Sequence, residues 1–123
     1  MTLQDLRQYP SIKAEINRLS RRLNLLRLEL AAAESEEIKA EIKKLYATLE
    51  TLHKQQLAKE IEITTQIAQI KDAQVRLSVQ LHYIDGLSWN EVANEIGGGN
   101  TDDACRKYVN RYFKKLSDMS VTI

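Results

Sequence analysis

The sequence predicts an all-α protein, in which a long N-terminal helical hairpin or coiled coil is followed by a C-terminal helix-turn-helix domain. Three observations predict this fold. The 123 residues include only four Gly and one Pro, which favours helices over a β-sandwich. Apolar residues recur at steps of three and four over the N-terminal half. Short capped segments separated by a run of glycines occupy the C-terminal half.

The first helix is predicted from an apolar stripe whose members alternate steps of four and three residues, as in a coiled coil. Pro10 is compatible with a helix start near Tyr9 or with a kink in a short leading helix through Leu3 and Leu6. We expect the arginines beside the stripe to form a solvated face rather than a nucleic-acid contact. The stripe consists of Ile12, Ile16, Leu19, Leu23, Leu26 and Leu30.

A lapse in this stripe predicts a tight turn near residue 34. Ser35 and the two glutamates after it suit the first turn of a second helix, because a hydroxyl caps free amides and acids match the positive end of the helix dipole. The stripe then loses phase around Gln56 and Lys59, which indicates a stutter. Its members are Ile38, Ile42, Leu45, Leu49 and Leu52, followed after the stutter by Ile63, Ile67 and Ile70.

The two long helices can pair with each other or with copies from another chain. An isolated two-helix hairpin buries little apolar surface, so we expect a homo-oligomer, whose subunit number the sequence leaves open. The predicted oligomerisation residues are the stripe members from Ile12 to Leu52. Residues 1–71 are accordingly predicted to be a coiled-coil oligomerisation segment.

The chain after Lys71 changes from long stripes to short capped segments. A short, largely buried helix is predicted from Val75 to Ile84, and Asp85-Gly86 stops it because glycine accepts a positive φ. Ser88 and Glu91 have the spacing of a capping box, which begins a short second helix.

A run of glycines from 97 to 99 predicts the turn after this second helix. Thr101 then caps a last helix, which we expect to run to about Leu116. A supporting helix, a short helix, a glycine turn and a basic helix are the elements of a helix-turn-helix. We therefore predict such a domain over residues 72–118 and a tail over residues 119–123.

Positive charge is concentrated in this last helix, although the net charge of the chain is only +1. Apolar residues at helical spacing would anchor one face and aim the basic face outward. Arg and Asn on such a face suit guanine and adenine edges in the major groove. The alternative is an amphipathic helix with a solvated basic face, and the acids at 102 and 103 weaken the DNA interpretation. The predicted DNA-binding residues are Thr101, Arg106, Lys107, Asn110, Arg111, Lys114 and Lys115.

Catalysis finds little support in the sequence. His53 and His82 lack metal-ligand spacing, and no nucleophile lies beside a base. Cys105 is the single cysteine, so it forms neither an internal disulfide nor a thiolate metal site. We expect a non-enzyme without metal or cofactor. No window is apolar enough for a membrane helix, and we expect a cytoplasmic protein.

Residues 81–93, Leu-His-Tyr-Ile-Asp-Gly-Leu-Ser-Trp-Asn-Glu-Val-Ala, resemble the helix-turn-helix of the fourth domain of bacterial sigma factors. The order Gly-x-Ser-x-x-Glu-Val-Ala carries this resemblance. The glycine turn followed by Arg106-Lys107 is similar, more narrowly, to small sigma-like regulators of phages and prophages of Gram-positive bacteria, in which a coiled coil precedes the sigma-like domain. The resemblance covers about residues 75–117. It implies a regulator of phage late genes that binds promoter DNA in the bacterial cytoplasm, with RNA polymerase as a further partner.

Two other functions fit the same elements. The DNA-recognition small subunit of a phage packaging terminase also combines helix-turn-helix and coiled-coil parts, and a ring of many subunits would favour it. A protein-interaction module built on a sigma-like fold is the other alternative, which an absence of DNA binding at low salt would favour.

Overall fold

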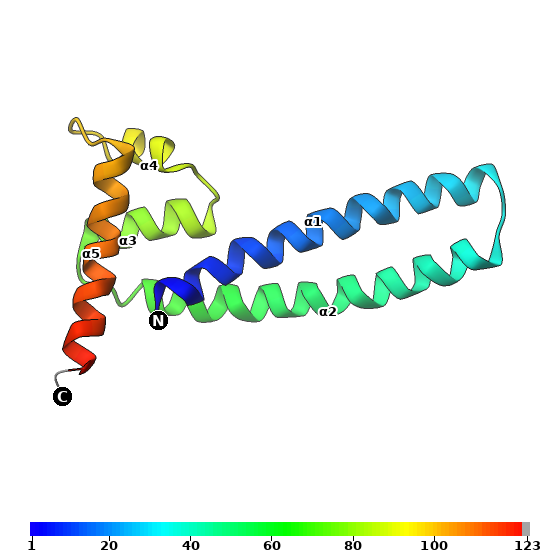
Figure 1. The fold of residues 1–123 in the computed structure, drawn as a ribbon, viewed down its shortest axis with the longest axis horizontal. Coiled ribbons are helices and arrows are strands. Elements are labelled where there is room, and N and C mark those ends of the chain that lie inside the picture. The colour runs from blue at the N-terminus through cyan, green and yellow to red at the C-terminus, as the bar shows by residue number, and fades with distance from the viewer. Residues whose placement is uncertain (122–123) are drawn as a thin grey trace. The chain divides into compact units, whose positions relative to one another are not determined.

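The computed structural model describes residues 1–121, with side chains described to residue 119, and this part of the chain is all-α (Figure 1). The predicted architecture of a long helical hairpin followed by shorter C-terminal helices is confirmed. No described helix is long and apolar enough to cross a membrane. The elements are α1 (Leu3–Ala32), α2 (Glu36–Ile67), α3 (Ala73–Val79), the π-helical turn η1 (Gln80–Ile84), α4 (Trp89–Ile96) and α5 (Asp102–Val121).

Helix α1 begins at Leu3 and continues through Pro10. Of the two alternatives at Pro10, a helix start near Tyr9 is wrong, and a helix that already includes Leu3 and Leu6 is present. Thr2 and Asp5 fix the true start: the Asp5 amide donates to Thr2 Oγ1 (3.2 Å), and the Thr2 amide donates to Asp5 Oδ2 (2.9 Å). This reciprocal cap satisfies amides at the helix start. Pro10 removes one hydrogen bond from the helix interior, and packing of the flanking residues keeps the helix intact.

The predicted turn near residue 34 is confirmed, because α1 ends at Ala32 and α2 begins at Glu36. The Ile38 amide donates to Ser35 Oγ at 3.4 Å, which makes Ser35 the cap expected from the sequence. Helix α2 then runs without interruption through the phase change near Lys59. The stutter therefore changes which face is buried and leaves the helix continuous.

The chain divides into two compact units. The hairpin unit comprises Ser11–Lys59, and the C-terminal unit comprises Met1–Pro10 together with the chain from Glu60 onward. Both divisions fall where the sequence changes, at Pro10 and at the loss of phase near Lys59. The boundary predicted between residues 71 and 72 lies inside the C-terminal unit, because the last apolar residues of α2 pack with the C-terminal helices.

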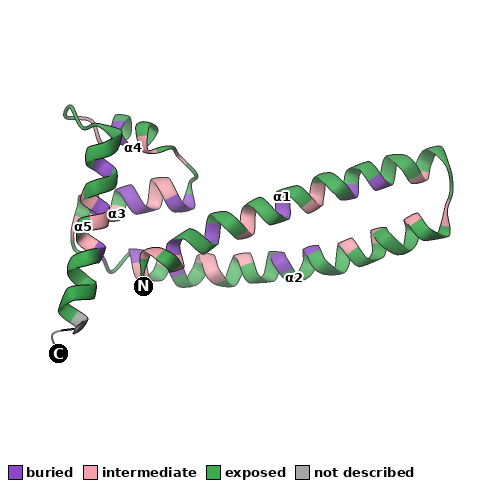
Figure 2. Cartoon of the chain, in the orientation of Figure 1, coloured by how far each residue is buried: buried purple, intermediate pink, exposed green. Residues whose placement is uncertain are grey.

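The core of the hairpin unit lies along the facing sides of its two helices (Figure 2). Helix α1 contributes Ile16 and Leu23, and α2 contributes Leu49 and Leu52. Four residues of the predicted stripes are partly buried against this core: Ile12, Leu19, Ile42 and Leu45. Leu26 is also buried, while Leu30 and Ile38 are half-buried near the turn. The choice that the sequence left open is thus resolved as an intramolecular hairpin, whose two stripes pair with each other.

The core of the C-terminal unit takes its buried residues from α1, α2, α3, η1 and α5, and the partly buried Trp89 of α4 packs against it. Its buried residues are Leu6, Tyr9, Ile63, Ile67, Ile70, Val75, Val79, Tyr83, Ile84, Val109 and Phe113. The first turns of α1 supply Leu6 and Tyr9, and the end of α2 supplies Ile63 and Ile67, so four of these eleven residues come from the two long helices. Leu77 departs from the predicted buried face of α3, since 45% of its surface is exposed.

Candidate nucleic-acid interface

Helix α4 is capped at its N-terminus and packed along one face. The predicted capping box is confirmed: the Glu91 amide donates to Ser88 Oγ (3.2 Å), and the Ser88 amide donates to Glu91 Oε1 (3.1 Å). Val92 is fully buried and Ala93 nearly so, where α4 packs against α5 and α3. The burial of these two side chains anchors α4 on the C-terminal unit, next to α5.

The start of α4 is anchored by an aromatic cluster. Trp89 stacks on the imidazole of His82 with ring centroids 4.0 Å apart, and Tyr83 meets both rings edge-on. His82 Nδ1 lies 2.7 Å from the Leu87 carbonyl oxygen. Because a carbonyl only accepts, Nδ1 carries the hydrogen. Trp89 is thus a packing anchor at the start of α4, and its partner His82 lies in the π-helical turn η1.

The turn between α4 and α5 depends on glycine. Gly97, Gly98 and Gly99 have φ values of 72°, 67° and 75°, in the left-handed region where a Cβ is strained. The Asn100 side-chain amide donates to the Gly97 carbonyl at 2.8 Å and closes the turn. This confirms the turn that the glycine run predicts.

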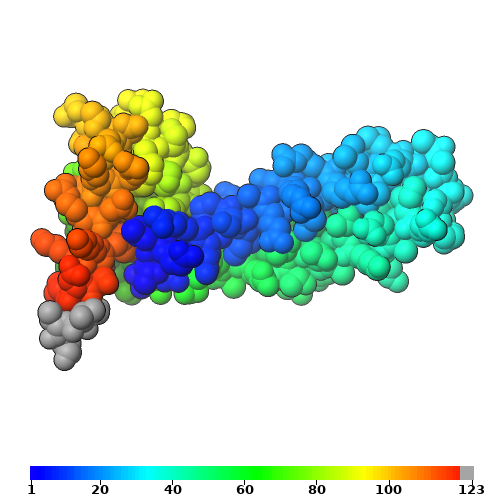
Figure 3. Space-filling model, in the orientation of Figure 1, coloured from blue at the N-terminus to red at the C-terminus, as the bar shows by residue number. Residues whose placement is uncertain are grey.

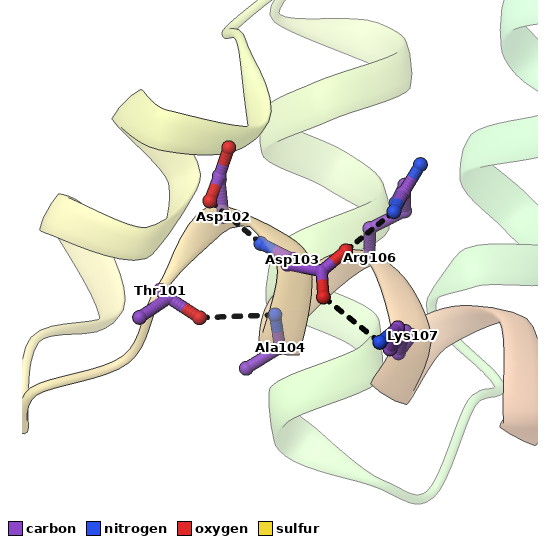
Figure 4. A network of polar contacts seen from close by, with 6 residues as sticks. All are labelled: Thr101, Asp102, Asp103, Ala104, Arg106 and Lys107. Atoms are coloured by element: carbon purple, nitrogen blue, oxygen red, sulfur yellow. Dashed lines mark hydrogen bonds and ion pairs between the residues drawn. The ribbon is translucent and has the colours of Figure 1, made fainter.

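Helix α5 begins with a hydroxyl cap and two acids (Figure 4). Thr101 Oγ1 accepts from the Ala104 amide at 3.1 Å, as its predicted capping role requires. The same contact engages the hydroxyl that was also predicted to bind DNA. In the free protein Thr101 therefore serves as the cap at the start of α5. Asp102 Oδ1 accepts from the Asp103 amide at 2.8 Å.

One face of α5 anchors the helix. Cys105 and Val109 are fully buried and Phe113 is 7% exposed, and burial raises the pKa of the Cys105 thiol. Leu116 shares the helical spacing of these residues but is 40% exposed. The helix also continues to Val121 instead of ending near Leu116, so the predicted tail of residues 119–123 begins inside α5; residues 122–123 lie outside the described part of the chain.

The opposite face of α5 carries the predicted cationic residues. Arg106, Lys107, Arg111, Lys114 and Lys115 are all exposed, and α5 is uncovered along its length in the view of Figure 3. Asn110 is half-buried and lines a groove of about 610 Å3 beside the first residues of the chain. The structure therefore brings the five cations onto one open helix face and places Asn110 at the edge of that face.

Asp103 lies one turn before Arg106 and Lys107, two of the predicted DNA-binding residues, and pairs with both (Figure 4). Its Oδ2 lies 2.9 Å from Lys107 Nζ, and its Oδ1 accepts from the Arg106 guanidinium. These two contacts, that of Lys107 first, lower the pKa of the Asp103 carboxyl, so it stays ionised at neutral pH. In the free protein Asp103 neutralises part of the charge of Arg106 and Lys107 and keeps their charged groups close to the first turn of α5.

A hydrogen bond between distant segments connects α5 to the start of α3. The Tyr108 hydroxyl donates to Asp72 Oδ2 at 2.7 Å, while Asp72 Oδ1 accepts from the amides of Gln74 and Val75 at 3.0 and 3.1 Å. Arg111 lies over the Tyr108 ring. Sequence reasoning missed this pair because its members are 36 residues apart, and no local pattern links them.

The Asp72 contacts predict a pH-dependent stability. Hydrogen bonds from Tyr108 and from the Val75 amide lower the pKa of Asp72 below its ordinary 3.8. A carboxyl group whose pKa is lower in the folded state stabilises the fold at pH values above its pKa in the unfolded state. This stabilisation is lost as the pH falls through its pKa in the folded state. We expect Asp72→Ala to reduce the free energy of unfolding at pH 7 by about 1–2 kcal/mol, the usual effect of losing an N-cap.

Urea unfolding at pH 7 and pH 2.5 checks this expectation. The difference between wild type and Asp72→Ala should shrink at the lower pH. Tyr108→Phe is the matched variant, because it keeps the cap and removes one donor; its smaller effect should follow the same pH trend. A difference that is as large at pH 2.5 as at pH 7 would contradict the assignment.

Comparisons of the chain with protein-family models, with curated proteins and with solved structures give no match. Function is therefore inferred from the residues of the helix-turn-helix and from the resemblance carried by residues 81–93.

Proposed function

We propose that the protein is a sequence-specific DNA-binding protein that uses α5 as its recognition helix and acts as a phage or prophage transcription regulator in the bacterial cytoplasm. One observation carries the proposal. Helix α4 packs against α5, whose inner face at Cys105 and Val109 is fully buried, while all five basic residues on its other sides are exposed. A rigidly supported cationic helix is what major-groove recognition requires.

The positions along α5 suggest a division of labour. Arg106 and Lys107 lie in the second turn, and the N-terminal part of a recognition helix reaches base edges. Arg111, Lys114 and Lys115 lie further along and suit the phosphate backbone, which supplies most of the affinity. The regulator role is supported by the sigma-like order of residues around Ser88 and Glu91, which the observed capping box explains physically.

A protein-interaction module is the second candidate, and Asp103 favours it. With its three acids, α5 carries a net charge of only +2 over its five basic and three acidic residues. Beyond the basic turns the helix exposes the apolar side chains of Leu116 and Met119. A surface of this kind suits a protein partner such as RNA polymerase.

Fluorescence anisotropy with a pool of duplex DNA fragments at 50 and 200 mM salt separates the two candidates. The DNA proposal predicts salt-sensitive binding that selects some fragments and that weakens strongly in Lys114→Ala/Lys115→Ala, by roughly tenfold for each phosphate contact removed. Arg21→Ala/Arg22→Ala is the matched control, because it removes the same charge from α1. No binding at 50 mM salt would favour the interaction module. An equal loss of DNA affinity in the α5 and α1 variants would mean that α5 is not the specific DNA-binding surface.

A further inference from the structure

Helix α2 carries a second stripe that the hairpin core leaves uncovered. This flanking stripe follows coiled-coil steps of four and three residues and consists of Lys39, Lys43, Tyr46, Glu50, His53 and Leu57, all exposed. Tyr46 is 47% and Leu57 60% exposed, which is unusual for large apolar side chains at heptad positions. The stripe is distinct from the residues that close the hairpin.

A groove runs beside this stripe on the hairpin unit. It measures about 680 Å3 and is lined by Tyr46, His53 and Leu57 from α2, and by Ser20, Asn24 and Arg27 from α1. The Arg27 guanidinium lies over the Tyr46 ring, 5.0 Å from its centroid. This contact restricts the Tyr46 ring in the free chain, which lowers the entropy lost when another surface packs against it.

We propose that α2 of a second copy of this chain occupies the groove in the antiparallel direction, so that two hairpin units form a four-helix bundle. The part of the stripe from Tyr46 to Leu57 is self-complementary about a twofold axis between residues 51 and 52. In that register Tyr46 faces Leu57 of the second copy, and Glu50 faces His53 of the second copy. Each of these facing pairs forms one layer of the interface, and each layer occurs twice, as a twofold interface requires.

The charges of the stripe exclude the parallel alternative. Parallel pairing in register would bring Lys39, Lys43 and Glu50 each against its own copy, and like charges at facing coiled-coil positions are repulsive. The antiparallel register instead places the Glu50 carboxylate, which pairs with Lys54 in the same helix at 3.3 Å, beside an imidazole. It also packs the two large apolar residues of the stripe together.

The partner so assigned is a second copy, and the contact stands independently of DNA binding by α5. It moves self-association from the stripes expected from the sequence, which close the hairpin, to the flank of α2. The four buried residues of the hairpin core remain 5–9% exposed, so none of them is fully buried. A four-helix arrangement buries more apolar surface than an isolated helix pair.

Sedimentation equilibrium of the full chain, with complementary variants, tests the register. The wild type is expected to form a dimer. Tyr46→Lys and Leu57→Glu are each expected to raise the dimer dissociation constant at least tenfold, because each buries a charge against an apolar residue in two layers. Mixing the two variants should restore the dimer, since one layer becomes a Lys–Glu pair and the other returns to Tyr–Leu.

Leu25→Lys is the matched control, because Leu25 is a 54% exposed leucine on α1 outside the groove; its mass should equal that of the wild type. Circular dichroism checks that each variant keeps its helices. A wild-type monomer at 100 µM, or a ring of many subunits, would overturn the proposal. Folded variants whose mixture stays monomeric would overturn the antiparallel register.

Discussion

Leu6→Ala is expected to reduce the free energy of unfolding of the C-terminal unit by about 2–5 kcal/mol, the usual cost of truncating a fully buried leucine. Leu6 is 0% exposed and belongs to the same core as Val79 and Val109. A loss of this size is a large part of the total stability of a small domain. The first turns of α1 thus control the stability of helices that begin more than sixty residues later.

Trp89 is the only tryptophan and packs against this core, so its fluorescence during urea unfolding reports on the C-terminal unit. Leu77→Ala is the matched control, since it makes the same chemical change at a half-exposed position of the same unit; its effect should stay below about 1 kcal/mol. Equal effects of the two substitutions would show that residues 1–10 are no part of this core in solution.

Opposite effects on DNA binding are expected from Asp103→Asn and Arg106→Ala. Asp103 pairs with both Arg106 and Lys107 in the free protein, so removing its charge should release two cations and strengthen binding to all sequences by about tenfold at low salt. Arg106→Ala should instead lower the preference for the selected sequence by about tenfold or more, because a base contact is lost.

Anisotropy titrations with a selected fragment and with a scrambled one measure both effects. Lys114→Ala supplies the comparison for a phosphate contact: it should weaken both fragments alike and reduce the salt slope by about one. Weaker binding of Asp103→Asn would mean that Asp103 itself accepts a hydrogen bond from a base, as carboxylates do from cytosine. Arg106→Ala effects that are equal on both fragments would count against base recognition.

The parts of the fold that the sequence predicts well are those with local causes. The Ser88–Glu91 capping box, the Thr101 cap and the glycine turn each depend on residues within four positions of one another, and the structure confirms all three. The two apolar stripes likewise follow from helical periodicity alone. Both kinds of signal need no knowledge of distant contacts.

The parts that the sequence predicts poorly depend on tertiary contacts. Pro10 lies within α1 because Leu6 and Tyr9 pack in the C-terminal core, and this overrides the local preference of proline. The same packing moves the unit boundary to positions 10 and 59. In the candidate site the cationic face is predictable from charge, whereas the orientation of Tyr108 toward Asp72 requires the folded chain.

The core of the C-terminal unit combines residues from the start of the chain with residues synthesised much later. Leu6 and Tyr9 leave the ribosome about a hundred residues before Phe113, which at typical synthesis rates is a delay of roughly 5–20 seconds. During that interval the hairpin unit already has all of its own residues and is free to close, while the core of Leu6 and Tyr9 still lacks Val109 and Phe113 of α5. Assembly of the C-terminal unit is therefore a late event, and until it occurs these first turns remain a target for chaperones and proteases.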